Sequence, residues 1–175
     1  MSPRRPSWRR DNRGSVAVEF AILAPMMIVM LGGIYEVGKA FQTLNAVNEL
    51  ASQYAITWAD CSDTPAGTCS TEMALYGTNG ALGNVAPQLT TGSITLQMFQ
   101  VAMSGTTPTV TYKYPSGASL TATQIAAAQG ALTTGQNGVV VTVNYTYTVT
   151  LFPGTLSGII PTSIPMSFTV AQLKA

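Results

Sequence analysis

The chain opens with a long apolar run, and alternating apolar and polar residues follow further on. From Val16 to Tyr35 the sequence reads VAVEFAILAPMMIVMLGGIY, and Glu19 is its only charged residue. A helix of this length, at about 1.5 Å per residue, reaches about 30 Å and crosses the hydrocarbon core of a bilayer. The run therefore predicts a membrane-spanning helix.

Helical spacing continues beyond the apolar run. Apolar and aromatic residues recur at intervals of three and four, while polar residues occupy the rest of the helical wheel. The apolar positions are Leu44, Val47, Ala51, Tyr54 and Trp58. The pattern predicts a single helix from about Val16 to about Trp58, with a first half that is apolar all round and an amphipathic second half.

Period-two alternation, which is typical of half-buried antiparallel strands, marks the second half of the chain. In Val139–Leu151 the odd positions are apolar and the even ones are mostly threonine, which predicts one buried face and one wet face. Ser93–Met103 and Thr109–Tyr114 are expected to form a hairpin. Ile164–Leu173 is a further strand, which Pro165 restricts to an edge or to a strand start.

The remaining segments complete an α+β fold. Thr121–Thr133 contains T-x-x-Q before an alanine run, which predicts a short capped helix, and Asp60–Thr71 reads as a turn region. We expect the outer half of the long helix to pack on a small antiparallel sheet. Four strand tyrosines are expected to be core or cross-strand residues rather than an exposed adhesive surface. They are Tyr112, Tyr114, Tyr145 and Tyr147.

Charge is concentrated at the start of the chain. Five of its 8 basic residues lie within the first thirteen positions, and no acidic residue follows Glu72. The five are Arg4, Arg5, Arg9, Arg10 and Arg13. A basic tail directly before an apolar run fits the positive-inside rule, so we expect a cytoplasmic N-terminus and an exported body. Nucleic-acid binding would need basic residues spread over a folded surface, and none is expected.

The two cysteines, Cys61 and Cys69, are expected to form a disulfide in an oxidising compartment. Their spacing is not that of a CxxC redox motif, and a chain without histidine is short of zinc ligands. Closing so short a loop contributes about 2–3 kcal/mol. If the body stayed in the cytoplasm, both would be free thiols. The nearby acids Asp60, Asp63 and Glu72 match no calcium loop and are expected to form a solvated turn.

Catalysis is not expected. The sequence has no histidine, no cysteine outside the expected disulfide and no pair of acids in its second half. General acid–base and nucleophilic chemistry draw on these groups. We therefore expect no enzyme activity, metal, cofactor or small-molecule substrate.

Polar and helix-breaking residues in and beside the apolar run need a reason. Pro25 removes a helical hydrogen bond and predicts a kink. Glu19 near the cytoplasmic end is either an interfacial carboxylate or a group kept for pairing with a positive charge on another chain. Glu36 and Lys39 are expected at the outer membrane interface, where Glu36 ends the span.

Residues 13–39, RGSVAVEFAILAPMMIVMLGGIYEVGK, resemble the start of a TadE-like protein of bacterial tight-adherence (Tad) pili. The shared parts are a basic leader, Gly14, small apolar residues, Glu19-Phe20, Pro25 and the element from Gly33 to Lys39. The resemblance implies that a membrane prepilin peptidase cuts between Gly14 and Ser15. It also implies that Glu19 pairs with the amino terminus of a neighbouring subunit. The flagship pilin of these systems has tyrosine where this chain has Phe20.

The expected organisation is a leader at 1–14, a transmembrane assembly helix at 15–38, its amphipathic extension at 39–60 and an extracytoplasmic β-rich domain at 61–175. The resemblance implies a minor pilin, or pseudopilin, whose partners are other pilin subunits, Tad assembly proteins, the prepilin peptidase and the inner membrane. It would act in pilus assembly, initiation or tip formation and in surface adhesion. The alternatives are an uncleaved type II membrane-anchored protein and an adhesin released by signal peptidase, which would begin after Leu31.

Overall fold

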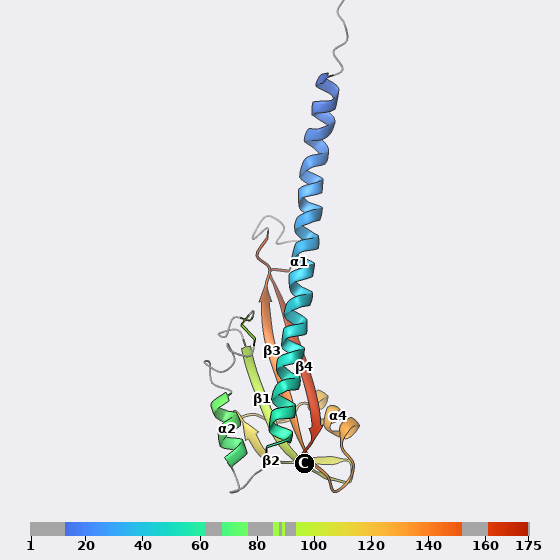
Figure 1. Cartoon of the computed structure of the whole chain (residues 1–175). Coiled ribbons are helices and arrows are strands. Elements are labelled where there is room, and N and C mark those ends of the chain that lie inside the picture. The colour runs from blue at the N-terminus through green and yellow to red at the C-terminus, as the bar shows by residue number, and fades with distance from the viewer. Residues whose placement is uncertain are drawn as a thin grey trace, which may run out of the picture.

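A computed structural model describes residues 13–61, 68–76, 86–87, 89, 94–151 and 161–174. One long helix, α1 (Arg13–Ala59), projects beyond the rest of the molecule with its first half and packs on a sheet with its second half (Figure 1). Two shorter helices and four strands complete the elements in these ranges. They are α2 (Thr68–Tyr76), β1 (Ile94–Ser104), β2 (Thr107–Tyr114), α4 (Ala122–Ala131), β3 (Asn137–Thr148) and β4 (Ser163–Leu173). The predicted α+β fold is confirmed.

The sheet is antiparallel, with the strand order β2-β1-β3-β4. The predicted hairpin is formed by β1 and β2, and β3 lies between β1 and β4. Both edge strands contain a proline, Pro108 in β2 and Pro165 in β4. Because proline cannot donate a ladder hydrogen bond, its position in an edge strand agrees with the prediction for Pro165.

The main core lies between α1 and one face of the sheet. The odd positions of β3 and the even positions of β1 and β4 point to this core, so the predicted alternation of β3 is confirmed on this side. The core includes Val47, Leu50, Tyr54, Trp58, Met98, Val139, Val141, Val143 and Met166. The helix prediction included Leu44 in this face, which is wrong, because Leu44 is exposed and the buried face is instead completed by Leu50.

A second, smaller core lies on the opposite face of the sheet, under α4. It contains Phe99, Val101, Met103, Ala128, Leu132 and Val140. The even positions of β3 are therefore not uniformly wet, because α4 covers Val140 and Thr142, whereas Thr146 and Thr148 are exposed as expected. The end of α4 comes close to β3 at Gly138, where an added Cβ would lie 2.5 Å from Cδ1 of Leu132, the C-cap residue of α4.

A buried glutamine joins α4 to three strands. Thr121 and Gln124 form the predicted capping box, in which the side-chain oxygen Oε1 of Gln124 accepts from the Thr121 backbone amide at 2.8 Å. The side-chain amide of Gln124 donates to Gln97 Oε1 of β1 and to Thr142 Oγ1 of β3, each at 2.9 Å. Thr142 Oγ1 in turn shares a hydrogen bond of 2.9 Å with Thr169 Oγ1 of β4. The cap is thus also the centre of a polar network across the sheet.

The segment after α1 differs from its prediction. Thr68–Thr71 belongs to α2 rather than to a turn, and Cys69 and Met73 bury one side of this short helix. Nine residues carry too few helical repeats to stand out from the polar stretch around them. Asp60 and Cys61 follow α1 outside any helix or strand, as predicted, and residues 62–67, including Asp63, lie outside the described residues.

Replacing Gln124 by alanine should lower the free energy of unfolding by about 2–3 kcal/mol, because three buried or partly buried side-chain hydrogen bonds are lost, one of which is half of the capping box. Urea denaturation of the full chain in detergent, followed by tryptophan fluorescence, measures this loss. Gln129→Ala is the matched control, since Gln129 is exposed on the same helix and donates one hydrogen bond to the Thr106 carbonyl. Its cost should be about 0.5–1 kcal/mol. Equal losses for the two variants would contradict the role of the network.

Candidate functional site

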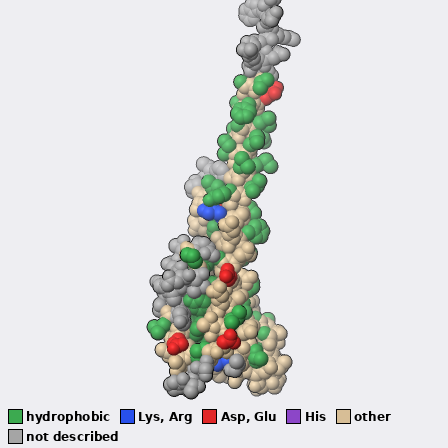
Figure 2. Space-filling view, in the orientation of Figure 1, with side chains coloured by type: hydrophobic (Ala, Val, Ile, Leu, Met, Phe, Trp, Pro, Cys, Tyr) green, Lys and Arg blue, Asp and Glu red, His purple; other side chains and the backbone are tan. Residues whose placement is uncertain are grey.

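The first half of α1 exposes apolar side chains on all sides. Figure 2 shows these side chains gathered along the projecting part of the helix, with little charge among them. By length and composition α1 is able to cross a membrane, and none of its most apolar stretch is buried inside the chain. In water such a surface is unfavourable. The geometry therefore agrees with the predicted membrane-spanning segment.

The residues predicted for processing and assembly lie on this projecting part. Glu19 and Phe20 sit within its first turns and are exposed on the chain. Helix α1 continues through Pro25, so the proline does not end it, and a kink there stays a prediction. Gly14 and Ser15 belong to the first turn of the helix, and the surroundings of both lie outside the described part of the structure.

Glu36 marks the point where α1 changes from exposed to packed. It is the first buried residue along the described helix, with a relative exposure of 9%. Its carboxylate accepts hydrogen bonds from Tyr147 Oη at 2.6 Å, from the Thr150 amide at 2.9 Å and from Thr150 Oγ1 at 2.8 Å. The Leu151 amide donates to it as well. An ionised carboxylate only accepts, so it suits a site that presents four donors.

This contact explains where β3 ends. The alternating pattern predicted a strand to Leu151, but β3 ends at Thr148 because the amides of Thr150 and Leu151 turn to Glu36. The donors lie more than 110 residues from Glu36 in the sequence. The contact therefore fastens the end of a central strand to the helix just beyond the apolar run.

Tyr147 is the hydroxyl donor in this cluster. Burial, and then the hydrogen bond and negative charge of Glu36, raise the pKa of Tyr147 to about 12. The phenol thus stays protonated, and remains a donor, throughout the physiological range. Tyr145 is also buried, and Tyr112 and Tyr114 pack against the main core, so the prediction that these tyrosines are core residues is confirmed.

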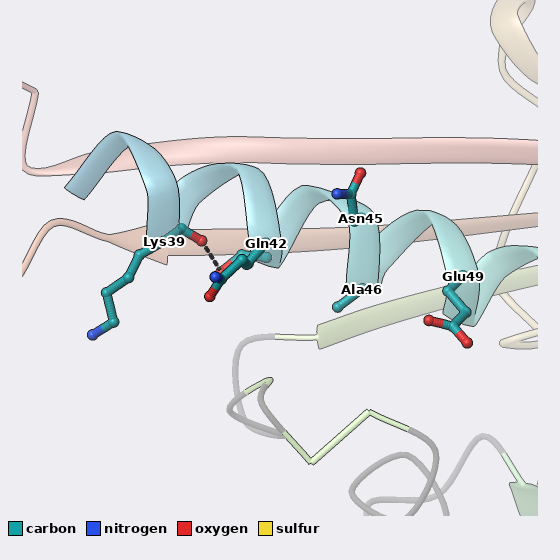
Figure 3. A pocket seen from close by; sticks show the side chains of 6 residues that line it. Lys39, Gln42, Asn45, Ala46 and Glu49 are labelled. Carbon is teal, nitrogen blue, oxygen red and sulfur yellow. Dashed lines mark hydrogen bonds between the residues drawn. The ribbon is translucent and has the colours of Figure 1, made fainter. Parts of the chain in front are cut away.

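The side of α1 that carries Lys39 is polar. Figure 3 shows the side chains of Lys39, Gln42 and Glu49, which line an open hollow on the helix surface together with Thr43, Asn45 and Ala46. The Lys39 ammonium lies 5.3 Å from the centre of the Tyr35 ring, which is a cation–π distance. All the lining residues come from one helix, and none is paired as an acid and base for catalysis. We call Lys39, Gln42, Asn45 and Glu49 the polar flank of α1.

The far end of α1 is held by a disulfide and a tryptophan. Cys61 and Cys69 are bonded, with their Cα atoms 5.9 Å apart, which links the end of α1 to α2. Trp58 is fully buried and meets the Tyr112 ring edge-on, with the ring centres 5.8 Å apart. The Tyr112 hydroxyl donates to the Ser70 carbonyl of α2 at 3.2 Å, so α1, α2 and β2 meet here.

Comparison with known proteins finds one match, and it falls on α1. Residues 14–55 match the family of TadE-like proteins. The first 55 residues contain a TadE-like segment. No curated protein and no solved structure matches the chain. The match runs from Gly14 through the apolar half of α1 into the half that packs on the sheet, and the sheet itself lies outside it. The family match therefore covers the N-terminal helix and not the sheet domain.

The TadE-like helix brings together only some of the predicted site residues. Glu19, Phe20 and Pro25 lie along its projecting part, whereas Glu36 and Lys39 lie at the junction with the sheet. The prediction gave Glu36 the role of ending the span and did not foresee its four hydrogen bonds. No local pattern in the sequence could have found these bonds, because their donors lie more than 110 residues from Glu36.

Replacing Glu36 by alanine should lower the free energy of unfolding by about 2–4 kcal/mol, because buried donors lose their acceptor. Hydrogen exchange of the Thr150 and Leu151 amides should rise more than that of β1. Glu49→Gln is the matched control, since this exposed carboxylate accepts only a surface hydrogen bond of 3.0 Å from Gln53 among the described contacts. It should leave both amides protected. Unchanged protection in the Glu36 variant would contradict the assigned contacts.

The raised pKa of Tyr147 predicts a loss of stability at alkaline pH. The folded pKa lies above the ordinary value of 10.0, so this stabilisation is complete below pH 10 and disappears as the pH rises through about 12. Comparing the pH dependence of urea unfolding in the wild type and in Tyr147→Phe isolates the contribution. The variant should be less stable by about 1–2 kcal/mol at neutral pH, and the difference should shrink above pH 10. A constant difference would contradict the prediction.

Proposed function

We propose that this protein is a minor pilin, or pseudopilin, of a Tad pilus. Helix α1 holds the unassembled chain in the bacterial inner membrane, with the N-terminus in the cytoplasm and the sheet domain in the periplasm. The supporting observation is that the TadE-like match coincides with the helix whose projecting half is exposed and apolar. The asymmetry of basic residues around this helix supports the orientation.

In this proposal the prepilin peptidase cuts between Gly14 and Ser15. Cleavage removes all five arginines of the leader and creates a new amino group on Ser15, one helical turn before Glu19. The charge of Glu19 and the amino group of a neighbouring subunit then compensate each other in a medium of low dielectric constant. Glu19 and Phe20 serve both in recognition by the peptidase and in the register of assembly.

The domain outside the membrane gives the subunit its own role in pilus initiation, at the tip or in surface adhesion. Support comes from the size of the domain and from its firm attachment to α1 at Glu36, which keeps helix and domain together as the subunit leaves the membrane. Its partners are the other pilin subunits and the Tad assembly proteins. The polar flank of α1 and the sheet need no cofactor for this role.

The first experiment determines the N-terminus by intact-mass spectrometry in cells with and without the prepilin peptidase. We expect a chain that begins at Ser15 only when the peptidase is present. A chain that keeps Arg4 to Arg13 in both strains would contradict the proposal and favour the uncleaved type II anchor. A mature N-terminus beyond Leu31 would instead indicate release by signal peptidase.

The Glu19→Leu variant provides a second arm of the same experiment. A lone membrane anchor would tolerate leucine, because an apolar side chain is favourable in the span. A pilin-like subunit should remain in the membrane but fail to enter pili. Glu49→Gln, a change of carboxylate on the same helix outside the membrane, should leave pilus incorporation unchanged.

A further inference from the structure

One end of the sheet lies beside α1 where the apolar run of the helix stops. Figure 1 shows β3 and β4 running along the outer half of α1, with the end of β3 and the start of β4 toward the projecting part of the helix. The Val149 amide donates to the Thr162 carbonyl at 3.0 Å, which joins the two strand ends. We call residues 149–151 and 161–163 the proximal end of the sheet.

Glu36 fixes the depth of the proximal end. It accepts hydrogen bonds from the Thr150 amide at 2.9 Å and from the Leu151 amide. Glu36 directly follows Tyr35, the last residue of the apolar run, and so lies only about 1.5 Å further along the helix axis. The interfacial layer of a bilayer is about 5–7 Å thick on each side of the hydrocarbon core. With the apolar run in the core, the proximal end therefore stands in this layer.

The chemistry of the proximal end suits a headgroup layer. Thr150 is exposed, and so are residues 161–163, which are proline, threonine and serine. No charged residue occurs between Lys113 and Lys174, and Lys174 follows β4 at the opposite end of the sheet. The sequence of residues 152–160, FPGTLSGII, is also uncharged. Neutral hydroxyls and apolar groups are tolerated at the interface, where an ionised group would lose hydration.

The backbone at the proximal end is already hydrogen-bonded within the chain. Beyond Thr148 the ladder of β3 stops, and an irregular chain with open amides would be costly next to lipid. The Val149 amide is bonded to Thr162, and the next two amides donate to Glu36. Glu36 thus fastens the strand end to the helix and also makes that strand end compatible with a partly dehydrated layer.

We propose that the proximal end of the sheet is a second membrane-contact surface, which rests in the headgroup layer of the bilayer that α1 crosses. The chain itself selects this occupant, because α1 brings the bilayer to the level of Glu36 and the contact continues the lipid-facing surface of the helix. A single helix would let the domain tilt about the point where it leaves the membrane. A second contact beside the helix keeps the opposite end of the sheet, where β1 and β2 are joined, away from the lipid.

The inference rests on the membrane-spanning part of the proposed function and not on leader cleavage. The full chain is placed in vesicles of phosphatidylethanolamine and phosphatidylglycerol. Because Cys61 and Cys69 are its only cysteines and are bonded, one added cysteine carries a fluorophore at a known place. Thr162→Cys reports the proximal end, Thr107→Cys is the matched exposed threonine at the opposite end, and Met30→Cys reports the apolar run. Lipids with a nitroxide on the headgroup or on the acyl chain quench the fluorophore at short range.

Headgroup nitroxides should quench the label at Thr162 about threefold more than the label at Thr107. The 11 residues of β4, at about 3.3 Å per residue, separate the two ends of the sheet by about 35 Å. Acyl-chain nitroxides should quench the label at Met30. Equal quenching at Thr162 and Thr107, with Met30 quenched, would overturn the contact and leave the span intact. An unquenched label at Met30 would remove the span itself and the inference with it.

A charge at the proximal end tests the contact a second time. Pro161→Asp in the Ser163→Cys chain should reduce headgroup quenching about threefold, because an ionised carboxylate resists the interface and is repelled by anionic lipid. Pro161→Asn is the matched neutral control and should keep the quenching. Pro161 is exposed, so neither change disturbs the core. Equal quenching of the aspartate and asparagine variants would overturn the proposal.

Discussion

The hydrogen bonds that Glu36 accepts join the long apolar helix to the sheet domain. No acidic residue follows Glu72 in the sequence, so the donors at the end of β3 take their carboxylate from α1. A serine or asparagine at this position would not offer two ionised oxygens to four donors. The same contact sets the position at which the sheet begins along the helix, and so sets how much of α1 projects beyond the domain.

Polar interactions hold the sheet together in a domain that is almost without charge. One face packs on α1 through apolar side chains, while the other face combines an apolar core with the chain of hydrogen bonds from Gln97 through Gln124 and Thr142 to Thr169. Because neutral amides and hydroxyls cost less to bury than ions, such a network stabilises the domain without the desolvation penalty of ion pairs. The disulfide adds a covalent link where α1 ends.

Much of this structure was predictable because its signals are local. The apolar run, the alternation in β3 and the T-x-x-Q capping box each lie within about a dozen residues, and the structure contains the corresponding helix, strand and cap. The contacts that were missed join distant parts of the chain. Glu36 meets donors more than 110 residues away, and α4 covers Val140 and Thr142 from outside the strand. No spacing rule within a single element reports such contacts.

The misassignment of Leu44 shows how one helix serves several neighbours. A three-four spacing places Leu44 and Val47 in one apolar row, but their side chains have different neighbours. Val47 is fully buried against the sheet, while Leu44 is exposed on the adjoining side of the helix. The sheet occupies one side of the outer half of α1 and the polar flank occupies another, while Val37, Phe41 and Leu44 are exposed. The sequence spacing reports which residues are apolar, but the position of the sheet decides which of them are buried.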